Sequence, residues 1–282
     1  MRPIGISALI SVHNEDHLLE PCVRSFVPWV DEVIVVENNS TDKSFQVAKK
    51  LAKRYKKVRV FSITCSDLYH NRRFALQQSK YQYIIRGDSD FVCIPDVCNN
   101  LRKALLSRNH SRLAVFRVKL VTLFGDFWHT RLSRMSSGLR KPSSRIFSWH
   151  DGLNFVKVGK RETTAVCSRA KRIVLKDPLF FHVTVKKMVP SLIRASRPHW
   201  RMQKSKKFRT VEDYALFRAK NEWGCSSIEE AARVRSRVLA KTLVKYDPDN
   251  YYAYPPEILQ AMKTTKIKVV YKNGSPYEII DS

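Results

Sequence analysis

Two carboxylates separated by one residue follow a run that is typical of a buried strand. The strand is expected over residues 81–86 and stops at Gly87, and Asp88 and Asp90 come directly after it. In an open α/β sheet, ligands bind beyond the carboxyl ends of the strands. Two carboxylates there can share one divalent cation, which keeps positions for water and a diphosphate. An isolated Asp-x-Asp is more often a polar turn, so the elements around it must decide.

Strand and helix patterns alternate over the first part of the chain. Apolar and β-branched runs predict strands at residues 6–12, 32–37, 58–63, 81–86 and 113–121. Between them, apolar residues recur at helical spacing, with Asn14 placed to cap the first helix and Pro95 to open the fourth. This alternation predicts an α/β fold with a doubly wound, Rossmann-like, mostly parallel sheet and flanking helices.

The rest of the chain has a weaker rhythm. Residues 145–158 resemble two short strands joined by a hairpin turn at His150-Asp151-Gly152, and a further strand is expected at 178–185. Residues 228–245 have the apolar spacing of a helix, and Lys272-Asn273-Gly274 marks a hairpin near the end. We therefore expect one catalytic domain followed by a basic, mainly helical C-terminal extension.

The chain carries a large excess of positive charge. Its 282 residues contain 52 Lys and Arg against 25 Asp and Glu, a formal net charge of +27. A small domain needs only about 2–8 net charges for solubility, so a polyanionic partner is predicted, either nucleic acid or an anionic membrane surface. Aromatic side chains lie among the basic ones and could stack on bases. The predicted nucleic-acid-binding residues are Arg140, Lys141, Arg197, Trp200, Arg201, Lys204, Lys206 and Lys207.

Cysteine usage and hydropathy bear on the compartment. The six cysteines lack a paired zinc spacing and are expected to be buried free thiols of a reducing compartment. No window holds about 18 uncharged apolar residues, so no transmembrane segment is expected. The expected location is cytoplasmic, with the protein soluble or peripheral to a membrane.

Four segments resemble glycosyltransferase family 2. In order, they are Ile10-Ser11-Val12-His13-Asn14-Glu15, Val35-Val36-Glu37-Asn38-Asn39-Ser40-Thr41-Asp42, Arg72-Arg73-Phe74-Ala75-Leu76 and Asp88-Ser89-Asp90. The resemblance implies the GT-A fold, a nucleotide-diphospho-sugar donor, most commonly a UDP-sugar, and Mn²⁺ or Mg²⁺ as cofactor. On this basis, residues 1–190 would form the catalytic domain, with a nucleotide-sugar half (1–122) and an acceptor half (123–190), and residues 191–282 the basic helical extension.

The resemblance also implies roles for single residues. Nucleotide-sugar contacts are expected from His13, Asn14, Glu15, Glu37, Asn39, Asp67, Arg72, Arg73, Asp88 and Ser89, and metal contacts from Asp88, Asp90 and His182. Glu37 replaces the family's usual Asp, which bears on the nucleotide preferred, and Arg73 replaces its usual Asn, which adds a cation near the diphosphate. Without the family, Glu37 is an ordinary strand-end acid and His182 is more often a core histidine.

Sugar transfer with inversion at the anomeric carbon requires a general base. The resemblance places Glu162 first and Asp151 second for this role, although Arg161 stands where the family often has His. The acceptor is predicted to be a hydroxyl on nucleic acid, for instance a hydroxymethylated DNA base turned out of the stack. Two alternatives stay open. One is a peripheral membrane transferase acting on lipid-linked or envelope glycans, and the other is a nucleic-acid-binding module with an inactive transferase fold.

Overall fold

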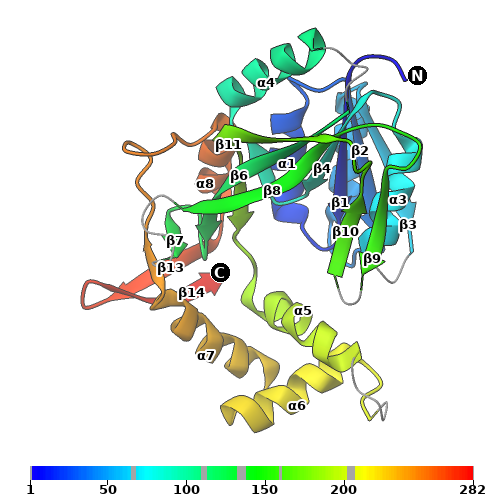
Figure 1. Cartoon of the computed structure of the whole chain (residues 1–282). Helices are drawn as coiled ribbons and strands as arrows, with labels where there is room; N and C mark the ends of the chain where they lie inside the picture. Colours follow the sequence, from blue (N-terminus) through cyan, green and yellow to red (C-terminus); the bar gives the residue numbers. More distant parts are fainter. Residues whose placement is uncertain are drawn as a thin grey trace. The chain divides into compact units, whose positions relative to one another are not determined.

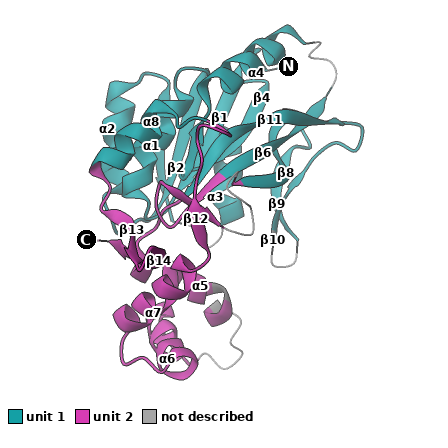
Figure 2. Cartoon of the chain, turned by 90° about the vertical axis from the view of Figure 1, so that its left-hand side faces the viewer, with its two compact units in different colours: residues 1–121, 139–183, 253–263 teal, residues 122–138, 184–252, 264–282 magenta. Residues whose placement is uncertain are grey.

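The computed structural model describes most of the chain, and its elements fall into two compact units. The described residues are 2–64, 68–108, 113–131, 138–158, 161–201 and 207–281. Asp67, Lys204 and Lys206 lie outside these ranges, so their assigned roles stay predictions. Unit 1 comprises Met1–Val121, Leu139–Val183 and Ala253–Lys263, and unit 2 comprises Thr122–Gly138, Thr184–Tyr252 and Thr264–Ser282 (Figure 2). The predicted domain boundary at residue 190 stays a prediction.

The main sheet has eight strands in the order β3-β2-β1-β4-β8-β6-β11-β5 (Figure 1). Its first four strands are parallel, and they are β1 (Ile6–Val12), β2 (Glu32–Asn38), β3 (Val58–Ile63) and β4 (Tyr83–Asp88). The helices that connect them are α1 (Asp16–Phe26), α2 (Ser44–Arg54) and α3 (Leu68–Gln78). This half of the sheet follows the predicted alternation of strand and helix.

Helices cover both faces of the parallel strands, which explains why these strands are apolar throughout. All seven residues of β1 are buried. Ala8 and Ile10 belong to the same buried cluster as residues of α1 and α2, whereas Leu9 belongs to a second cluster with Ala75 and Leu76 of α3. Successive side chains of a strand point to opposite faces, so the two clusters are the two layers above and below the sheet. The predicted α/β class is confirmed.

The other half of the sheet is antiparallel. It contains β5 (Phe91–Cys93), β6 (Ala114–Phe124), β8 (Leu139–Ser148) and β11 (Lys171–Thr184), with antiparallel pairs β4–β8, β6–β8 and β5–β11. The helix α4 (Pro95–Ser107) follows β5 and has a proline in its first turn, as predicted. The complete sheet is therefore mixed, with its parallel strands gathered in the N-terminal half.

The hairpin predicted across His150-Asp151-Gly152 is wrong. A turn is present there, but β8 pairs with β4 and β6, whereas β9 (Asn154–Val158) pairs with β10 (Arg161–Ala165) in a separate two-stranded sheet. The apolar end of β8 explains the difference, because Ile146 and Phe147 are fully buried between two strands of the main sheet. A short-range turn signal could not compete with that burial.

Unit 2 is mainly helical and carries two small sheets. Its helices include α5 (Met188–Arg201), α6 (Val211–Trp223) and α7 (Ile228–Ala240), while α8 (Pro256–Thr264) lies almost wholly within unit 1. The small sheets are β7 (His129–Arg131) with β12 (Leu243–Lys245) and β13 (Ile267–Lys272) with β14 (Ser275–Asp281). The predicted hairpin turn is confirmed, since Asn273 and Gly274 both have positive φ, 50° and 74°. Among the described residues, no helix has the length and hydrophobicity needed to cross a membrane.

Candidate active site

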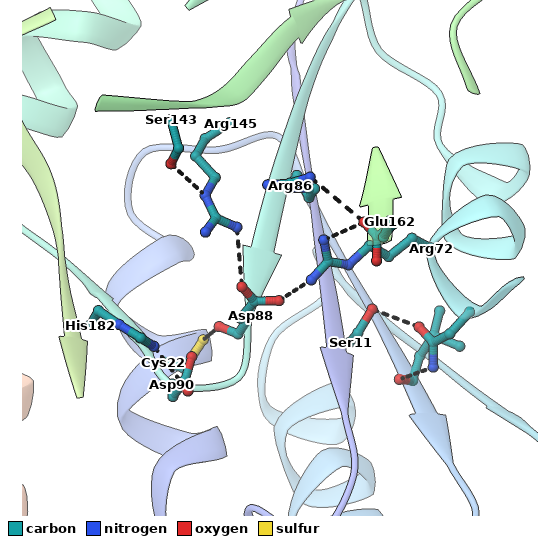
Figure 3. A network of polar contacts seen from close by, with 12 residues as sticks. Ser11, Cys22, Arg72, Arg86, Asp88, Asp90, Ser143, Arg145, Glu162 and His182 are labelled. Carbon is teal, nitrogen blue, oxygen red and sulfur yellow. Dashed lines mark hydrogen bonds and ion pairs between the residues drawn. The ribbon is translucent and has the colours of Figure 1, made fainter. Parts of the chain in front are cut away.

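Asp88 lies at the carboxyl end of β4 and is held by two arginines from other elements (Figure 3). Its Oδ1 accepts a hydrogen bond from Nη2 of Arg72 on α3, and its Oδ2 accepts one from Nη1 of Arg145 on β8 at 3.1 Å. The antiparallel pairing Ile85↔Ile146 brings Arg145 alongside β4. Both carboxylate oxygens of Asp88 therefore already accept from guanidinium groups.

Arg72 links Asp88 to a second carboxylate. Its Nη1 donates to Oε1 of Glu162 on β10 at 2.7 Å, and the Arg86 guanidinium lies 3.6 Å from the same oxygen. The Arg72 side chain is 6% exposed. The Glu162 Oε2 atom is buried and has no hydrogen-bond partner among the described residues. One buried guanidinium thus bridges the predicted metal motif and the predicted general base, and Glu162 keeps one oxygen available.

The charges in this cluster shift one another's ionisation. Burial by itself raises the pKa of Asp88, but Arg72 and Arg145 outweigh it and bring that pKa below its usual value. Burial, together with repulsion from Arg145 and Arg72, lowers the pKa of Arg86 to about 10. Burial likewise lowers the pKa of Arg145. At neutral pH Arg86 and Arg145 remain cations and Asp88 an anion.

Asp90 and His182 form the second half of the site. The pairing of β11 with β5 places His182 opposite Phe91, and its Nε2 lies 3.4 Å from Oδ2 of Asp90. The His182 Nδ1 is 3.1 Å from Nη1 of Arg140, and a guanidinium can only donate, so Nδ1 is the acceptor. The described residues contain no group of three or more His, Cys, Asp or Glu side chains arranged to hold a metal ion. Asp90 and His182, two of the predicted metal ligands, nevertheless lie next to each other.

Hydrogen bonds connect the loop after β1 to the loop after β2. Asn14 and Asn39 have positive φ, 54° and 50°, a conformation that asparagine tolerates better than most residues. The Asn14 Oδ1 accepts from Thr41 N at 2.7 Å, and His13 Nδ1 lies 2.8 Å from Asn38 O. The Glu15 N donates to Ser44 Oγ at 2.9 Å. The predicted nucleotide-binding residues of these two loops are thus together at the carboxyl ends of neighbouring strands.

Other predicted residues lie in varied surroundings. Glu37 is 2% exposed, and its carboxylate accepts from Ser62 Oγ at 2.8 Å and from the Ser40 backbone N–H. Ser89 is buried, whereas Arg73 on α3 is exposed. Asp151 is exposed in the turn after β8. Their assigned roles stay predictions.

The predicted nucleic-acid-binding residues fall in both units. Arg140 and Lys141 lie on β8 in unit 1, with Arg140 beside His182. Arg197, Trp200, Arg201 and Lys207 belong to unit 2. There, the Trp200 indole donates to Phe208 O at 3.0 Å, and the Lys207 ammonium lies 5.7 Å from the centre of the Phe208 ring.

Reasoning from the sequence missed two residues that contact the predicted site. Arg86 and Arg145 were not assigned to the donor site, yet one lies within 3.6 Å of Glu162 and the other hydrogen-bonds Asp88. A signal for Arg86 was present, because it is the single charge within the apolar run of β4 and, two residues before Asp88, it points to the same face. Placing Arg145 requires the non-local register of β8 against β4.

Comparison with known proteins shows to which family the chain belongs. The model described as Glycosyl transferase family 2 matches residues 7–164, which is more than half of the 282-residue chain. The chain belongs to glycosyltransferase family 2. The predicted membership is confirmed, and with it the GT-A class of a Rossmann-like sheet with flanking helices. The matched range includes Arg72, Asp88, Arg145 and Glu162.

Individual relatives of this family 2 chain are distant. It is 26% identical to an uncharacterized glycosyltransferase of Rickettsia typhi over 137 residues. This aligned region covers 48% of this chain and 44% of the relative. It is 27% identical over 118 residues to one of Rickettsia bellii, which covers 42% and 38%. The chain thus spans less than half the length of these curated relatives.

Solved structures show similarly low identity. S. aureus TarS (residues 1–349), in a complex with UDP-GlcNAc, is 14% identical, with 98% of this chain and 99% of that chain covered and a TM-score of 0.47. Glucosyl-3-phosphoglycerate synthase from Mycobacterium tuberculosis is 21% identical, with 44% of each chain covered and a TM-score of 0.31.

Proposed function

We propose that this protein transfers a sugar from a nucleotide-diphospho-sugar, with UDP as the expected nucleotide, to an acceptor hydroxyl with inversion at the anomeric carbon. The observation that carries the proposal is the convergence of Arg72, Arg86 and Arg145 at the carboxyl end of β4. Guanidinium groups match the geometry and charge of diphosphate oxygens. Family 2 membership supplies the class of reaction.

A divalent cation fits beside these arginines. Asp90 offers a carboxylate oxygen, the kind of ligand that Mn²⁺ and Mg²⁺ prefer, and the remaining positions suit water and diphosphate oxygens. His182 would offer its Nε2 lone pair only after the ring proton moves to Nδ1, which requires Arg140 to release that atom. Asp88 joins them only by releasing a hydrogen bond from Arg72 or Arg145. The bound ion would act as a Lewis acid that neutralises the leaving diphosphate.

Charge balance favours such an ion. Arg72, Arg86, Arg140 and Arg145 face Asp88, Asp90 and Glu162, so four guanidinium groups against three carboxylates leave one net positive charge. A diphosphate carries more negative charge than this, and it gains more when its bond to the sugar breaks. A site without a cation would therefore leave the departing group only partly neutralised.

Glu162 is the proposed general base. Its Oε1 is fixed by Arg72, and its buried Oε2 can accept a proton. As the acceptor oxygen bonds to the anomeric carbon, the bond from that carbon to the diphosphate breaks. The hydroxyl proton passes to Oε2, and the arginines stabilise the charge on the leaving group. Asp151, exposed in its turn, lacks comparable positioning.

The donor proposal is tested by ligand-induced stabilisation. A panel of nucleotide-sugars, each with and without Mn²⁺, should raise the melting temperature for the true donor, and a ligand at 100 times its Kd adds about 2.7 kcal/mol. The metal-dependent part of the shift should vanish in Asp90→Asn and persist in Asp177→Asn, an exposed acid on β11. The proposal fails if no nucleotide-sugar stabilises the wild-type protein under either condition.

The proposed acceptor is a hydroxyl on nucleic acid, for instance on a hydroxymethylated DNA base. The net charge of +27 supports it, because a phosphate backbone attracts such a surface. Labelled sugar should appear on DNA with hydroxymethylated bases, and not on lipid-linked acceptors in acidic vesicles. Transfer confined to the vesicles would establish the peripheral membrane alternative. DNA binding without turnover of any nucleotide-sugar would establish the inactive binding module.

A further inference from the structure

Four arginines of unit 2 converge from four different elements. Arg131 ends β7, and Arg194, Arg218 and Arg235 lie on α5, α6 and α7, three helices that pack against one another (Figure 2). Burial lowers the pKa of Arg235, and repulsion from the other three arginines lowers it further. Arg218 and Arg235 also both reach α5, where they contact Ser196 and Ser191, two residues that flank Arg194 in the sequence. None of the four belongs to the sites assigned above.

The protein holds several of these guanidinium groups in place. Arg235 is half-buried, and its Nη1 lies 3.5 Å from Ser191 O. Arg218 Nη1 donates to Ser196 Oγ at 3.3 Å. The Arg131 guanidinium lies 3.9 Å from the centre of the Phe124 ring. A solvated basic helix face would extend such side chains into water from a single helix, so this arrangement differs from an ordinary charged surface.

The cluster has more positive than negative charge. Arg218 is paired with Glu222 through two contacts of 2.7 and 2.6 Å, whereas the named charges that act on Arg235 are all arginines. Collecting like charges in a half-buried position costs free energy, which a bound anion recovers.

We propose that Arg131, Arg194, Arg218 and Arg235 form a binding site for backbone phosphate groups of a nucleic-acid acceptor. The inference rests on the proposed acceptor class and identifies the residues that bind this acceptor. Guanidinium groups suit this role because their planar donors bind phosphate oxygens in pairs. A phosphate contact is independent of sequence, so the site positions the polymer and leaves base choice to other residues.

The test uses the full chain and single-stranded DNA, with a peptide nucleic acid of the same sequence as an uncharged-backbone control. Anisotropy titrations at several salt concentrations should show about tenfold weaker DNA binding for Arg194→Gln, and a slope of log K against log salt that is smaller by about 1. Arg235→Gln should weaken DNA binding and reduce the slope in the same way. Arg194 is exposed, so Arg194→Gln still tests the site if Arg235→Gln fails to fold. Lys220→Gln removes one exposed charge from α6 and should change the slope less.

The outcomes separate this inference from the donor and acceptor proposals. Equal affinities and slopes for wild type, Arg194→Gln and Arg235→Gln overturn the phosphate site while leaving the acceptor class intact. No DNA binding by the wild type at low salt overturns both. Binding to vesicles that contain acidic lipid is measured in parallel. If the variants bind these vesicles more weakly but bind DNA as the wild type does, the cluster binds lipid phosphates and the inference is refuted. The metal-dependent shift by the nucleotide-sugar should be the same in all variants.

Discussion

Arg72→Gln is expected to destabilise the protein because it leaves two acids without their shared partner. Removing one member of a buried ion pair costs about 3–5 kcal/mol. The Arg72 side chain is 6% exposed, but Glu162 is 15% and Asp88 26% exposed, so water compensates part of the loss. Asp88 also keeps Arg145 at 3.1 Å, and Glu162 keeps Arg86 at 3.6 Å. We therefore expect a loss of about 2–3 kcal/mol, below or at the lower end of that range.

Urea unfolding at pH 7 measures this loss as a lower midpoint with an unchanged m-value. Arg73→Gln is the matched control, since it is the next residue on α3 and is exposed, and its free energy of unfolding should lie within about 0.5 kcal/mol of wild type. Equal unfolding free energies for the two variants would refute the assignment of Arg72 as the buried bridge.

The pH dependence provides a second check on Arg72→Gln. The pKa of Asp88 is lowered in the folded protein, so its stabilising effect is complete above the unfolded value of about 3.9 and is lost as the pH falls through the folded pKa. The difference in stability between wild type and Arg72→Gln should therefore be constant from about pH 5 to 7 and shrink below about pH 4. A difference that grows in acid would contradict the ion-pair explanation.

Three further substitutions test other parts of the site and fold. Glu162→Gln should lower kcat about 10²–10⁴-fold and keep the donor-induced thermal shift, because its amide oxygen still accepts from Arg72; unchanged kcat would remove Glu162 as the base. Asn14→Ala should cost about 1–2 kcal/mol in urea unfolding, since alanine at φ 54° is strained and the bond to Thr41 is lost. Thr210→Ala removes the capping box of α6 and should cost about 1 kcal/mol, seen as faster amide exchange in that helix; unchanged exchange would show that the cap is dispensable.

Sequence reasoning succeeded where the determining interactions are local. The apolar runs of β1, β2 and β4 and the helical spacing between them depend on neighbours within a few residues, and the Asn273-Gly274 turn depends on two residues with positive φ. The Asp88 motif was recognisable because chain order alone places it after a buried strand. These features predicted both the α/β class and the edge of the sheet that carries the site.

It failed where partners are distant in the chain. Pairing of β8 with β4 brings Arg145 to Asp88 across 57 residues, and no local signal specifies that register. The compact units are equally non-local, because Ala253–Lys263 returns to unit 1 after a long passage through unit 2. Charge counts predict an affinity for polyanions, but they could not reveal that Arg140 lies beside His182 in unit 1 while Arg194 lies on α5 in unit 2.

The composition of the site is itself an argument for its role. A buried ion network is a weak source of stability, because replacing it with well-packed apolar side chains is often neutral or stabilising by about 1–4 kcal/mol. Burial, together with repulsion from Arg145 and Arg72, lowers the pKa of Arg86 to about 10. Stability of the sheet edge alone therefore does not explain why three arginines that repel one another are placed there. Three arginines collected at the end of a central strand are instead expected where an anion must be bound and its growing charge neutralised.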